Sequence, residues 1–305
     1  MISDERPPNP ARVDVVLLTW NQREDTLECL RSLARMSYRS YRVLIVDNGS
    51  SDGTAEAIRR EFPRIEVLRS EMNLGFSGGF NAGLRHALED GAEYLLVLNN
   101  DTVVAPNLLD ELMAHSAASD VGMLAPKIYY SNDPGRIWSV GGRRSWWNYE
   151  MIDTGNGQHD RGQWEQVLER DYLVGCAILL KRELLEQVGL FDERFSPIYY
   201  EDVDLCLRAR SAGFRLLLVP SAKLWHKVAS SGGGVGSPRE RYLMARNSVL
   251  LFRKHVRGWR WLIVFPYRFG SAIKTSLRLV LAGRFRSLIA YWKGVADGLQ
   301  SEPPS

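Results

Sequence analysis

Residues 13–126 alternate between short apolar runs and segments in which apolar residues recur every three or four positions. The apolar runs predict strands at residues 13–19, 43–47, 65–70 and 94–98. The segments between them predict amphipathic helices, such as residues 78–90, and a further helix is expected with Pro106 in its first turn. Strands that alternate with helices are typical of a parallel sheet covered by helices on both faces.

The pattern is less regular in the middle of the chain. Residues 141–164 are polar, contain glycine and are rich in tryptophan, which predicts a long exposed excursion. Its aromatic residues suit either a sugar platform or the packing of a small hairpin. A strand followed by a helix is predicted at residues 172–189, and a later strand ends at His226. The glycine-rich residues 230–238 predict a flexible loop that can act as a lid.

Polar clusters follow three of the predicted strands. They are Thr19-Trp20-Asn21, Asp47-Asn48 and Asn99-Asn100-Asp101. One such cluster is equally well explained by a turn, because Asn and Asp favour turns and helix caps. Ligands of parallel α/β sheets, however, gather beyond the carboxyl ends of the strands. Three polar strand ends at one edge therefore favour a ligand site.

The composition is that of an ordinary folded protein, since 45% of the 305 residues are hydrophobic and 25% are charged. The three cysteines, Cys29, Cys176 and Cys206, are far apart and odd in number. This spacing argues against a disulfide framework and a zinc cluster, and it fits a reducing compartment. Residues 1–12 are polar and proline-rich without the apolar core of a signal peptide, which predicts a loose cytoplasmic tail.

Positive charge is concentrated near the C-terminus. Residues 239–293 contain thirteen lysines and arginines and one acid, Glu240, so the rest of the chain is net negative. Within residues 259–293 the basic residues alternate with aromatic and aliphatic ones, and the longest apolar stretch is far below the ~20 residues of a spanning helix. The pattern predicts amphipathic helices in the headgroup plane of an anionic membrane. The alternative is a pair of helices packed on the preceding domain.

Asp47 raises the possibility of a nicotinamide-binding fold, in which an acid after the second strand binds the ribose. That fold requires a glycine-rich turn after the first strand, and TWNQRED at residues 19–25 contains no glycine. The glycine-rich residues 75–83 follow the third strand and lack the required spacing. A sugar-phosphate nucleotidyltransferase requires a Gly- and Arg-rich phosphate loop near the start, which is missing as well. Both interpretations are rejected.

Seven ordered segments together resemble the family-2 glycosyltransferases, inverting enzymes that use nucleotide-diphospho-sugars. The segments are TWNQREDTLECLRSL, VDNGSSDGT, NLGFSGGFNAGL, LVLNNDT, GLFDERF, YYEDVDLCLR and LWH. The pattern is most similar to rhamnosyltransferases and galactofuranosyltransferases of cell-surface polysaccharide assembly. The resemblance implies an α/β fold of the GT-A (Rossmann-like) type, a mostly parallel sheet flanked by helices.

We therefore expect three regions. A GT-A catalytic domain spans residues 13–238, with a nucleotide-sugar half at 13–126 and an acceptor half at 127–238. It follows the tail at residues 1–12 and precedes a basic amphipathic helical region at residues 239–305.

A divalent cation on the donor's two phosphates assists sugar transfer. Negative charge develops on the leaving diphosphate, and Mg²⁺ typically stabilises such charge through one or two protein carboxylates and phosphate oxygens. Asp101 is the natural ligand for Mg²⁺ or Mn²⁺. The family motif is usually Asp-X-Asp, but Asn99 replaces the first acid here, so we expect weak metal binding without the nucleotide. His226 matches a family histidine that completes the metal site, although a lone histidine at a strand end is often structural.

The resemblance also implies a binding site for the donor. It is formed by Thr19, Asn21, Asp47, Asn73, Gly75, Phe76, Asn81, Asn99 and Asn100. Asp47 matches the residue that accepts a hydrogen bond from the pyrimidine ring, whereas Thr19 and Asn21 are equally suited to cap the following helix. A glycine at position 75 permits close backbone approach, and Phe76 is also suited to the core.

Inversion requires a base that takes the proton of the acceptor hydroxyl on the face opposite the leaving group. Asp202 matches the family's base, and Glu201 is the alternative if the helix begins one residue away. Acids favoured by a helix dipole explain both residues without any catalytic role. Arg246 matches a family Arg-Asn pair and is expected to face the diphosphate or the acceptor.

The predicted function is transfer of a sugar from a dTDP-rhamnose-like or UDP-sugar donor to a hydroxyl of a lipid-linked or polysaccharide acceptor. The protein is expected to lie in the cytoplasm at the inner face of the cell membrane, with no nucleic acid among its partners, and to be able to form a homo-oligomer. The main alternative is a catalytically inactive nucleotide-sugar-binding or assembly subunit. A glycosidase also uses two carboxylates, but it needs neither a metal nor a pyrimidine pocket.

Overall fold

The computed structural model describes residues 11–228 and 236–301. Most of the expected N-terminal tail, residues 1–12, and most of the expected lid, residues 230–238, lie outside the described residues.

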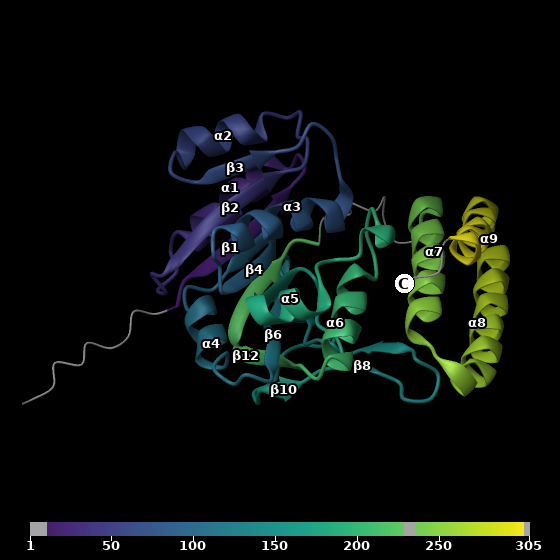
Figure 1. Ribbon diagram of the computed structural model, residues 1–305. Coiled ribbons are helices and arrows are strands. Elements are labelled where there is room, and N and C mark those ends of the chain that lie inside the picture. The colour runs from purple at the N-terminus through teal and green to yellow at the C-terminus, as the bar shows by residue number, and fades with distance from the viewer. Residues whose placement is uncertain (1–10, 229–235, 302–305) are drawn as a thin grey trace, which may run out of the picture.

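One large mixed sheet forms the centre of the α/β body (Figure 1). In the described residues its strands lie in the order β10-β12-β6-β11-β4-β1-β2-β3, with β5 added to β12 and β7 to β6. The neighbours β4, β1, β2 and β3 are parallel, while β11 runs antiparallel between β4 and β6. The strands are β1 (Val13–Thr19), β2 (Tyr41–Asp47), β3 (Glu66–Arg69), β4 (Tyr94–Asn99), β5 (Thr102–Val104), β6 (Val121–Tyr130), β7 (Asp133–Ser139), β10 (Leu168–Glu169), β11 (Ala177–Lys181) and β12 (Arg215–His226).

Helices cover both faces of this sheet, because its central strands are apolar on both sides. The helices of the body are α1 (Arg23–Leu33), α2 (Thr54–Glu61), α3 (Gly75–Glu89), α4 (Leu108–Ala114), α5 (Arg182–Val188) and α6 (Glu201–Ser211). Apolar residues of α1, α2 and α4 share one core cluster, and those of α3, α5 and α6 share the other. The predicted α/β class and mostly parallel sheet are confirmed.

Two local details differ from the sequence-based expectation. Pro106 precedes α4 rather than lying in its first turn, because its carbonyl accepts hydrogen bonds from Ser37 and the helix begins at Leu108. The short strand β5 was not predicted, since it is fixed by antiparallel pairing with β12, more than 100 residues away.

The tryptophan-rich excursion contains a small hairpin. Its strands are β8 (Gly142–Arg144) and β9 (Met151–Asp153), which pair antiparallel to each other. Trp146 and Trp147 lie between them and are exposed. The Trp147 ring packs edge-on against Tyr267 at a centroid distance of 5.7 Å. The small hairpin is present, but Trp146 and Trp147 are exposed, so neither proposed role of these aromatic residues is confirmed.

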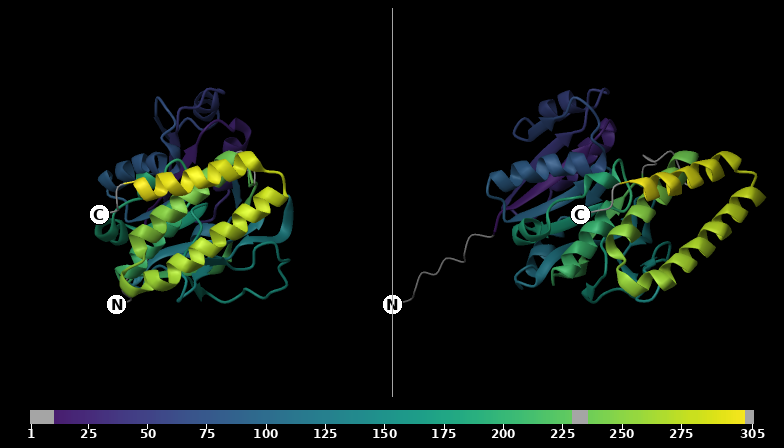
Figure 2. Two further views of the ribbon diagram at one scale, coloured as in Figure 1. Left: turned by 90° about the vertical axis from the view of Figure 1, so that its right-hand side faces the viewer. Right: turned by 45° about the vertical axis from the view of Figure 1, so that its right-hand side comes forward.

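The C-terminal region consists of α7 (Pro238–His255), the short 3₁₀ helix η2 (Gly258–Arg260), α8 (Trp261–Leu281) and α9 (Phe285–Gln300). These helices stand beside the α/β body (Figures 1 and 2). Helix α7 joins the core of the body through Leu250 and Leu251. Helix α9 packs closely on α7. The approach is so close at Gly294 that a Cβ atom there would lie 2.3 Å from the Tyr242 carbonyl oxygen. The expected boundary at residue 238 therefore falls at a helix that shares the body's core.

Membrane-spanning helices are not found in the described part of the chain: none there is both long and apolar enough to cross a bilayer.

Candidate active site

The carboxyl ends of the parallel strands bring the predicted polar clusters together. In the register of β1 with β2, Thr19 lies opposite Asp47, and in the register of β1 with β4, Leu18 lies opposite Asn99. The three clusters therefore lie at one edge of the sheet, as the sequence predicts.

Asp47 presents a buried carboxylate at this edge. Its Oδ1 accepts a hydrogen bond from the Ser50 amide at 2.9 Å. Its Oδ2 accepts no hydrogen bond from the described residues and lies 3.6 Å from Nε of Arg69. A buried carboxylate oxygen gains free energy from a donor, so this oxygen suits an incoming N–H of a base.

Thr19 and Asn21 form the link between the first two strand ends. The Thr19 hydroxyl hydrogen-bonds to the Thr26 hydroxyl at 2.8 Å and donates to the Asn21 carbonyl. Oδ1 of the Asn21 side chain accepts from the Ser51 backbone amide, and the backbone N–H of Asn21 donates to the Ser50 hydroxyl. These contacts shape the loop next to Asp47, but they do not cap α1, whose N-cap residue is Gln22 without a side-chain cap hydrogen bond. Direct contact of either residue with a nucleotide stays a prediction.

The glycine-rich segment after β3 is held by a network of amides. Asn48 donates to Oδ1 of Asn73 and to the Gly75 carbonyl, both at 3.0 Å, and accepts from the Leu74 amide. Gly75 has a positive φ of +74°, and a Cβ atom there would lie 2.6 Å from Oγ of Ser196. Glycine is therefore required at position 75, because a loop of the acceptor half closes over it.

Phe76 and Asn81 of α3 both contact the segment that follows α5. The Phe76 ring packs on Phe80 and Phe191, with centroids at 4.6 and 5.7 Å. The Asn81 side chain donates to the Phe191 carbonyl and to Glu193, and accepts from the Phe191 amide. Both residues hold α3 against the loop after α5. Their predicted contact with the donor stays a prediction.

Asp101 and His226 form the candidate metal site. Oδ1 of Asp101 lies 3.1 Å from Nε2 of His226, and both side chains are buried. The Trp138 ring packs edge-on against the imidazole at 4.5 Å and restricts its orientation. One carboxylate and one imidazole at this separation fit a divalent cation that takes its remaining ligands from a diphosphate.

The protonation of His226 is consistent with a site that exchanges a proton for a metal ion. Burial lowers the pKa of His226, but Cys176 and Asp101 outweigh burial and raise it to about 10. A divalent cation bound by the imidazole requires the neutral ring. Metal binding here is therefore expected to release a proton.

The two asparagines before Asp101 play different parts. Asn99 closes β4, and its carbonyl accepts from the Thr102 hydroxyl at 2.8 Å. Asn100 is buried and points toward α1, where its amide donates to the Thr26 hydroxyl at 3.0 Å. Asn100 thus anchors the turn that carries Asp101, and its predicted contact with substrate stays a prediction.

A second cluster of possible metal ligands lies elsewhere. Glu66, His86 and Asp90 place one ligand atom each within 4.8 Å of one another. Glu66 begins β3 and Asp90 follows the end of α3, so the cluster lies at the opposite edge of the sheet from Asp101. Arg42 already forms an ion pair with Asp90 at 2.6 Å. This cluster does not belong to the candidate active site.

Asp202 lies in the first turn of α6 as a half-buried carboxylate. Its Oδ2 accepts from the Gly175 amide and its Oδ1 from the Val203 amide, both at 2.8 Å. Burial raises the pKa of Asp202, and the two amides oppose that rise. Phe76 and Asp202 meet at Gly175, because a Cβ atom there would lie 3.0 Å from the Phe76 ring and 3.2 Å from Cβ of Asp202. The carboxylate therefore borders the glycine-rich segment of the donor half.

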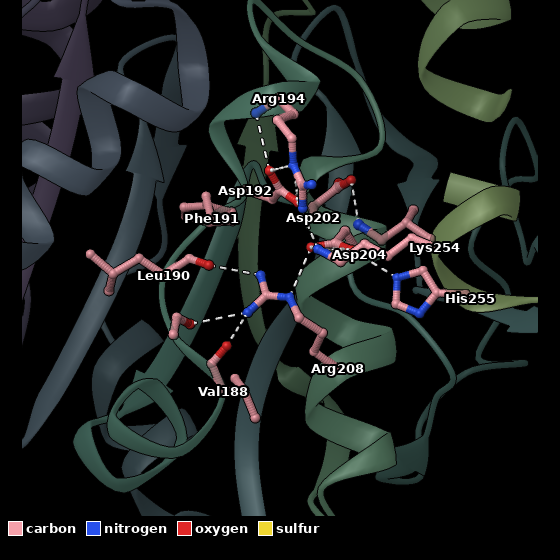
Figure 3. A network of polar contacts seen from close by, with 12 residues as sticks. Val188, Leu190, Phe191, Asp192, Arg194, Asp202, Asp204, Arg208, Lys254 and His255 are labelled. Carbon is pink, nitrogen blue, oxygen red and sulfur yellow. Dashed lines mark hydrogen bonds and ion pairs between the residues drawn. The ribbon is translucent and has the colours of Figure 1, made fainter. Parts of the chain in front are cut away.

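The neighbouring acids of α6 differ from Asp202. Glu201 is buried, and burial raises its pKa well above the usual value, with the Asp202 charge adding to the rise. Asp204 is bound by Arg208 at 2.8 Å, Lys254 at 2.9 Å and His255 at 2.7 Å (Figure 3). Asp204 thus ties α6 to the end of α7 and is not available for catalysis. Asp202 remains the best candidate for a base.

The family model for glycosyl transferase family 2 matches residues 14–189. The chain belongs to glycosyl transferase family 2. A relative of known name in Mycobacterium tuberculosis (strain H37Rv), an N-acetylglucosaminyl-diphospho-decaprenol L-rhamnosyltransferase, is 30% identical over 288 residues, which cover 86% of this chain and 91% of the relative. The dTDP-rhamnosyl transferase RfbF of Shigella flexneri is 21% identical over 252 residues, covering 80% and 81% of the two chains. The chain also spans 25% of the length of the uncharacterized protein y4gI of Sinorhizobium fredii, at 29% identity over 71% of this chain.

Solved structures of glycosyltransferases share the fold of this family-2 chain. GalNAc-T7 with UDP, GalNAc and Mn²⁺ matches with a TM-score of 0.62 and 18% identity, over 80% of this chain and 48% of that one. The mannosyltransferase PcManGT of Pyrobaculum calidifontis, in complex with GDP-Man and Mn²⁺, matches with a TM-score of 0.60 and 18% identity, over 97% and 77% of the chains. At this identity the likeness shows the fold, and the GT-A fold expected from the sequence is confirmed.

Two residues that organise the site of this family-2 glycosyltransferase were not predicted from the sequence. Asn48 organises the glycine-rich segment, and Gly175 supplies an amide to Asp202. Asn48 stands directly after Asp47 in the motif VDNGSSDGT, which was the signal available for it. Gly175 carries no local signal, because its role depends on a contact 27 residues along the chain.

Proposed function

We propose that this chain is an inverting glycosyltransferase that moves a sugar from a dTDP-rhamnose-like or UDP-sugar donor to a hydroxyl of a lipid-linked acceptor in cell-surface glycan assembly. The observation that carries the proposal is the pair Asp101–His226 at 3.1 Å on the edge of the sheet that also holds Asp47. Diphosphate departure requires a cation there, and Asp202 is a separate carboxylate for deprotonating the acceptor.

Each residue has a distinct task in this reaction. Asp47 receives the base N–H on its Oδ2, and the loop around Gly75 supports the sugar-nucleotide by close backbone approach. Asp101 and His226 would hold Mg²⁺ or Mn²⁺, and the cation would supply electrostatic stabilisation for the charge on the leaving diphosphate. Asp202 accepts the proton of the acceptor hydroxyl as that oxygen attacks the anomeric carbon, and the attack from the opposite face inverts the configuration. Arg246 donates to the Ser196 carbonyl at 3.2 Å, and we assign it to the acceptor side of the site.

The relatives support the choice of donor and acceptor class. One relative is named for transferring L-rhamnose to an N-acetylglucosaminyl-diphospho-decaprenol, and another is named as a dTDP-rhamnosyl transferase. By analogy we assign this chain a rhamnose-like donor and a polyprenyl-diphosphate-linked sugar as acceptor.

The direct test is a donor panel. Purified protein is incubated with dTDP-rhamnose, UDP-sugars and GDP-sugars, with and without Mg²⁺ or Mn²⁺, and release of nucleoside diphosphate is measured in the presence of a polyprenyl-diphosphate-sugar acceptor. We expect metal-dependent release from one donor class together with a product of inverted anomeric configuration. Calorimetric binding of a nucleotide-sugar without any turnover would instead support the inactive-subunit alternative.

A lipid-linked acceptor places the enzyme at the inner face of the membrane, and α8 and α9 carry a surface suited to that position. Exposed apolar residues recur every three or four positions along both helices, so each helix carries one apolar stripe. They are Leu262, Phe265, Phe269, Ile273, Leu277, Val280 and Leu281 on α8, and Phe285, Ile289, Trp292 and Leu299 on α9. We call these residues the apolar face. Helices α8 and α9 lie on the outer side of the C-terminal region in both views of Figure 2.

Basic side chains flank the apolar face. The exposed cations after α7 are Arg257, Lys274, Arg278, Arg284, Arg286 and Lys293. Among the described residues of α8 and α9 the one acid is Asp297, and it accepts a hydrogen bond from the Tyr242 hydroxyl at 2.8 Å. This combination of an apolar stripe with cations and almost no acids complements an anionic lipid surface. Peripheral binding through the apolar face is therefore part of the proposal.

Removing two side chains from the apolar face is expected to weaken membrane binding. Burial of one large apolar side chain in the bilayer contributes about 1.5 kcal/mol or more to the binding free energy. The double substitution Phe269→Ser with Ile273→Ser should therefore reduce binding to phosphatidylglycerol-containing vesicles by more than tenfold. Co-sedimentation with vesicles measures this change. Val167→Ser is the matched control, because Val167 is an exposed apolar residue of the α/β body next to β10. This variant should bind vesicles like the wild type.

Two results would count against membrane docking. One is equal pelleting with neutral and anionic vesicles, or none with either. The other is a wild-type dimer in sedimentation velocity that the double substitution converts to a monomer, because a second copy of the chain then covers the apolar face.

A further inference from the structure

Five consecutive backbone carbonyls precede the candidate base, and each is bound from outside its own turn. The Asn247 amide lies 2.7 Å from the carbonyl oxygen of Phe195 and 3.0 Å from those of Ile198 and Tyr199. Arg246 donates to the carbonyl of Ser196 at 3.2 Å, and the amide of Phe76 donates to that of Pro197 at 2.8 Å. Residues 195–199 are therefore fixed by α7 on one side and by the donor half on the other.

The backbone that follows needs this support. Tyr199 and Tyr200 have positive φ angles of 87° and 74°, a region that non-glycine residues rarely adopt. Such conformations persist when the surrounding structure determines them. Tyr200 then caps α6, which begins at Glu201. The position of α6, and with it the position of Asp202, depends on how this turn is held.

Asn247 suits this task better than any other contact of the turn. It is fully buried in α7, and it contributes three of the five carbonyl contacts. Its own Oδ1 accepts a hydrogen bond from the Arg246 guanidinium at 2.9 Å, so both the nitrogen and the oxygen of the side-chain amide are hydrogen-bonded. The side chains of residues 196–200 are half-buried, which means that hydrophobic packing alone does not set the turn.

We infer that Asn247 is a positioning residue of the active site: it holds the turn at residues 195–200 so that Asp202 lies at the start of α6 within reach of the acceptor. The inference rests on the proposed function, in which Asp202 is the base. The same turn also packs on the glycine-rich segment of the donor half, where a Cβ atom at Gly75 would lie 2.9 Å from Cα of Pro197. A helix of the C-terminal region thereby sets the geometry of the base.

The first measurement does not need activity. Hydrogen–deuterium exchange is compared for the wild type, Asn247→Ser and Asn247→Asp, where serine keeps one donor and aspartate sets an oxygen against the carbonyls. We expect exchange at residues 196–206 to accelerate at least tenfold, more in the aspartate variant, with strands β1 to β4 unchanged. Unaltered exchange at residues 196–206, or a uniform increase across the chain, overturns the inference.

The second measurement separates positioning from general stability. A misplacement of the base by about 1 Å is expected to lower kcat by roughly 10- to 100-fold, while the KM for the donor stays within twofold. In the Asp202→Asn background, Asn247→Ser should change the residual kcat less than twofold, because both substitutions act through the same carboxylate. An equal loss in both backgrounds contradicts this role. Ser248→Ala, a neighbouring buried substitution in α7, is the control and should keep wild-type kcat.

The two measurements keep the claims apart. If the wild type turns over no donor in the panel described above, the proposed function fails, and the exchange result alone decides whether Asn247 holds the turn. If the donor panel succeeds and the exchange pattern does not change, the proposed function stands and the positioning role is wrong.

Discussion

Replacing Asp101 with alanine is expected to lower Mg²⁺- or Mn²⁺-dependent turnover by roughly 10²-fold or more, the scale of losing one electrostatic stabiliser of a developing negative charge. Asp101 supplies the carboxylate of the motif Asn99-Asn100-Asp101, and its Oδ1 lies 3.1 Å from His226. The two asparagines offer no charge in its place. The fold should survive, because the backbone carbonyl of Asp101 still accepts from the Lys227 amide at 2.9 Å.

Glu66→Ala is the matched control for this experiment. It removes a carboxylate from the other cluster of possible metal ligands, at the opposite edge of the sheet. Its turnover should equal that of the wild type, and Mn²⁺ binding in the presence of nucleoside diphosphate, measured by calorimetry, should weaken in Asp101→Ala alone. Near-normal activity of Asp101→Ala with metal present, or a metal response lost in Glu66→Ala, would move the metal site away from Asp101.

The sequence predicts the nucleotide half of the fold well, because its signals are local. The apolar run before Asn99 is buried on both faces, and its polar end falls at the edge of a parallel sheet, where three such ends converge. The order of the later strands does not follow from local pattern. Strand β11 enters antiparallel between β4 and β6, and that arrangement depends on pairings between distant segments.

The site shows the same division. Asp47 and Asp101 stand at recognisable strand ends and Asp202 matches a family motif, so their candidacy is visible in the sequence. The long-range contacts that fix the site are not visible in the sequence. Asn247 reaches carbonyls 48 to 52 positions away, and Asn81 binds a loop 110 positions away. A buried asparagine on a helix carries no mark of its partners, and for that reason the positioning role of Asn247 emerges from the three-dimensional structure.

The Asp202→Asn substitution is expected to lower kcat by about 10²-fold or more, the usual contribution of a positioned base. Asparagine keeps the shape of the side chain and removes its basicity. The affinity for the donor nucleotide should stay nearly unchanged, because Asp202 bonds to the Gly175 and Val203 amides and not to Asp47 or its partners Ser50 and Arg69. Transfer rate and nucleotide binding are measured on the same preparation. Weaker nucleotide binding with a normal rate would place Asp202 in the donor pocket instead.

Glu201→Gln is the informative companion to that experiment. Burial raises the pKa of Glu201 well above its usual value, and the Asp202 charge adds to the rise, so the neutral acid is favoured over the carboxylate compared with an exposed glutamate. Glutamine resembles that neutral acid, and we expect less than a tenfold loss of kcat, on the scale of altered positioning rather than of a lost base. Burial also raises the pKa of Asp202 above 3.8. Since the base must be deprotonated to act, kcat should rise with pH through an apparent pKa above that value, and this limb should vanish in Asp202→Asn but persist in Glu201→Gln. The opposite pattern would make Glu201 the base.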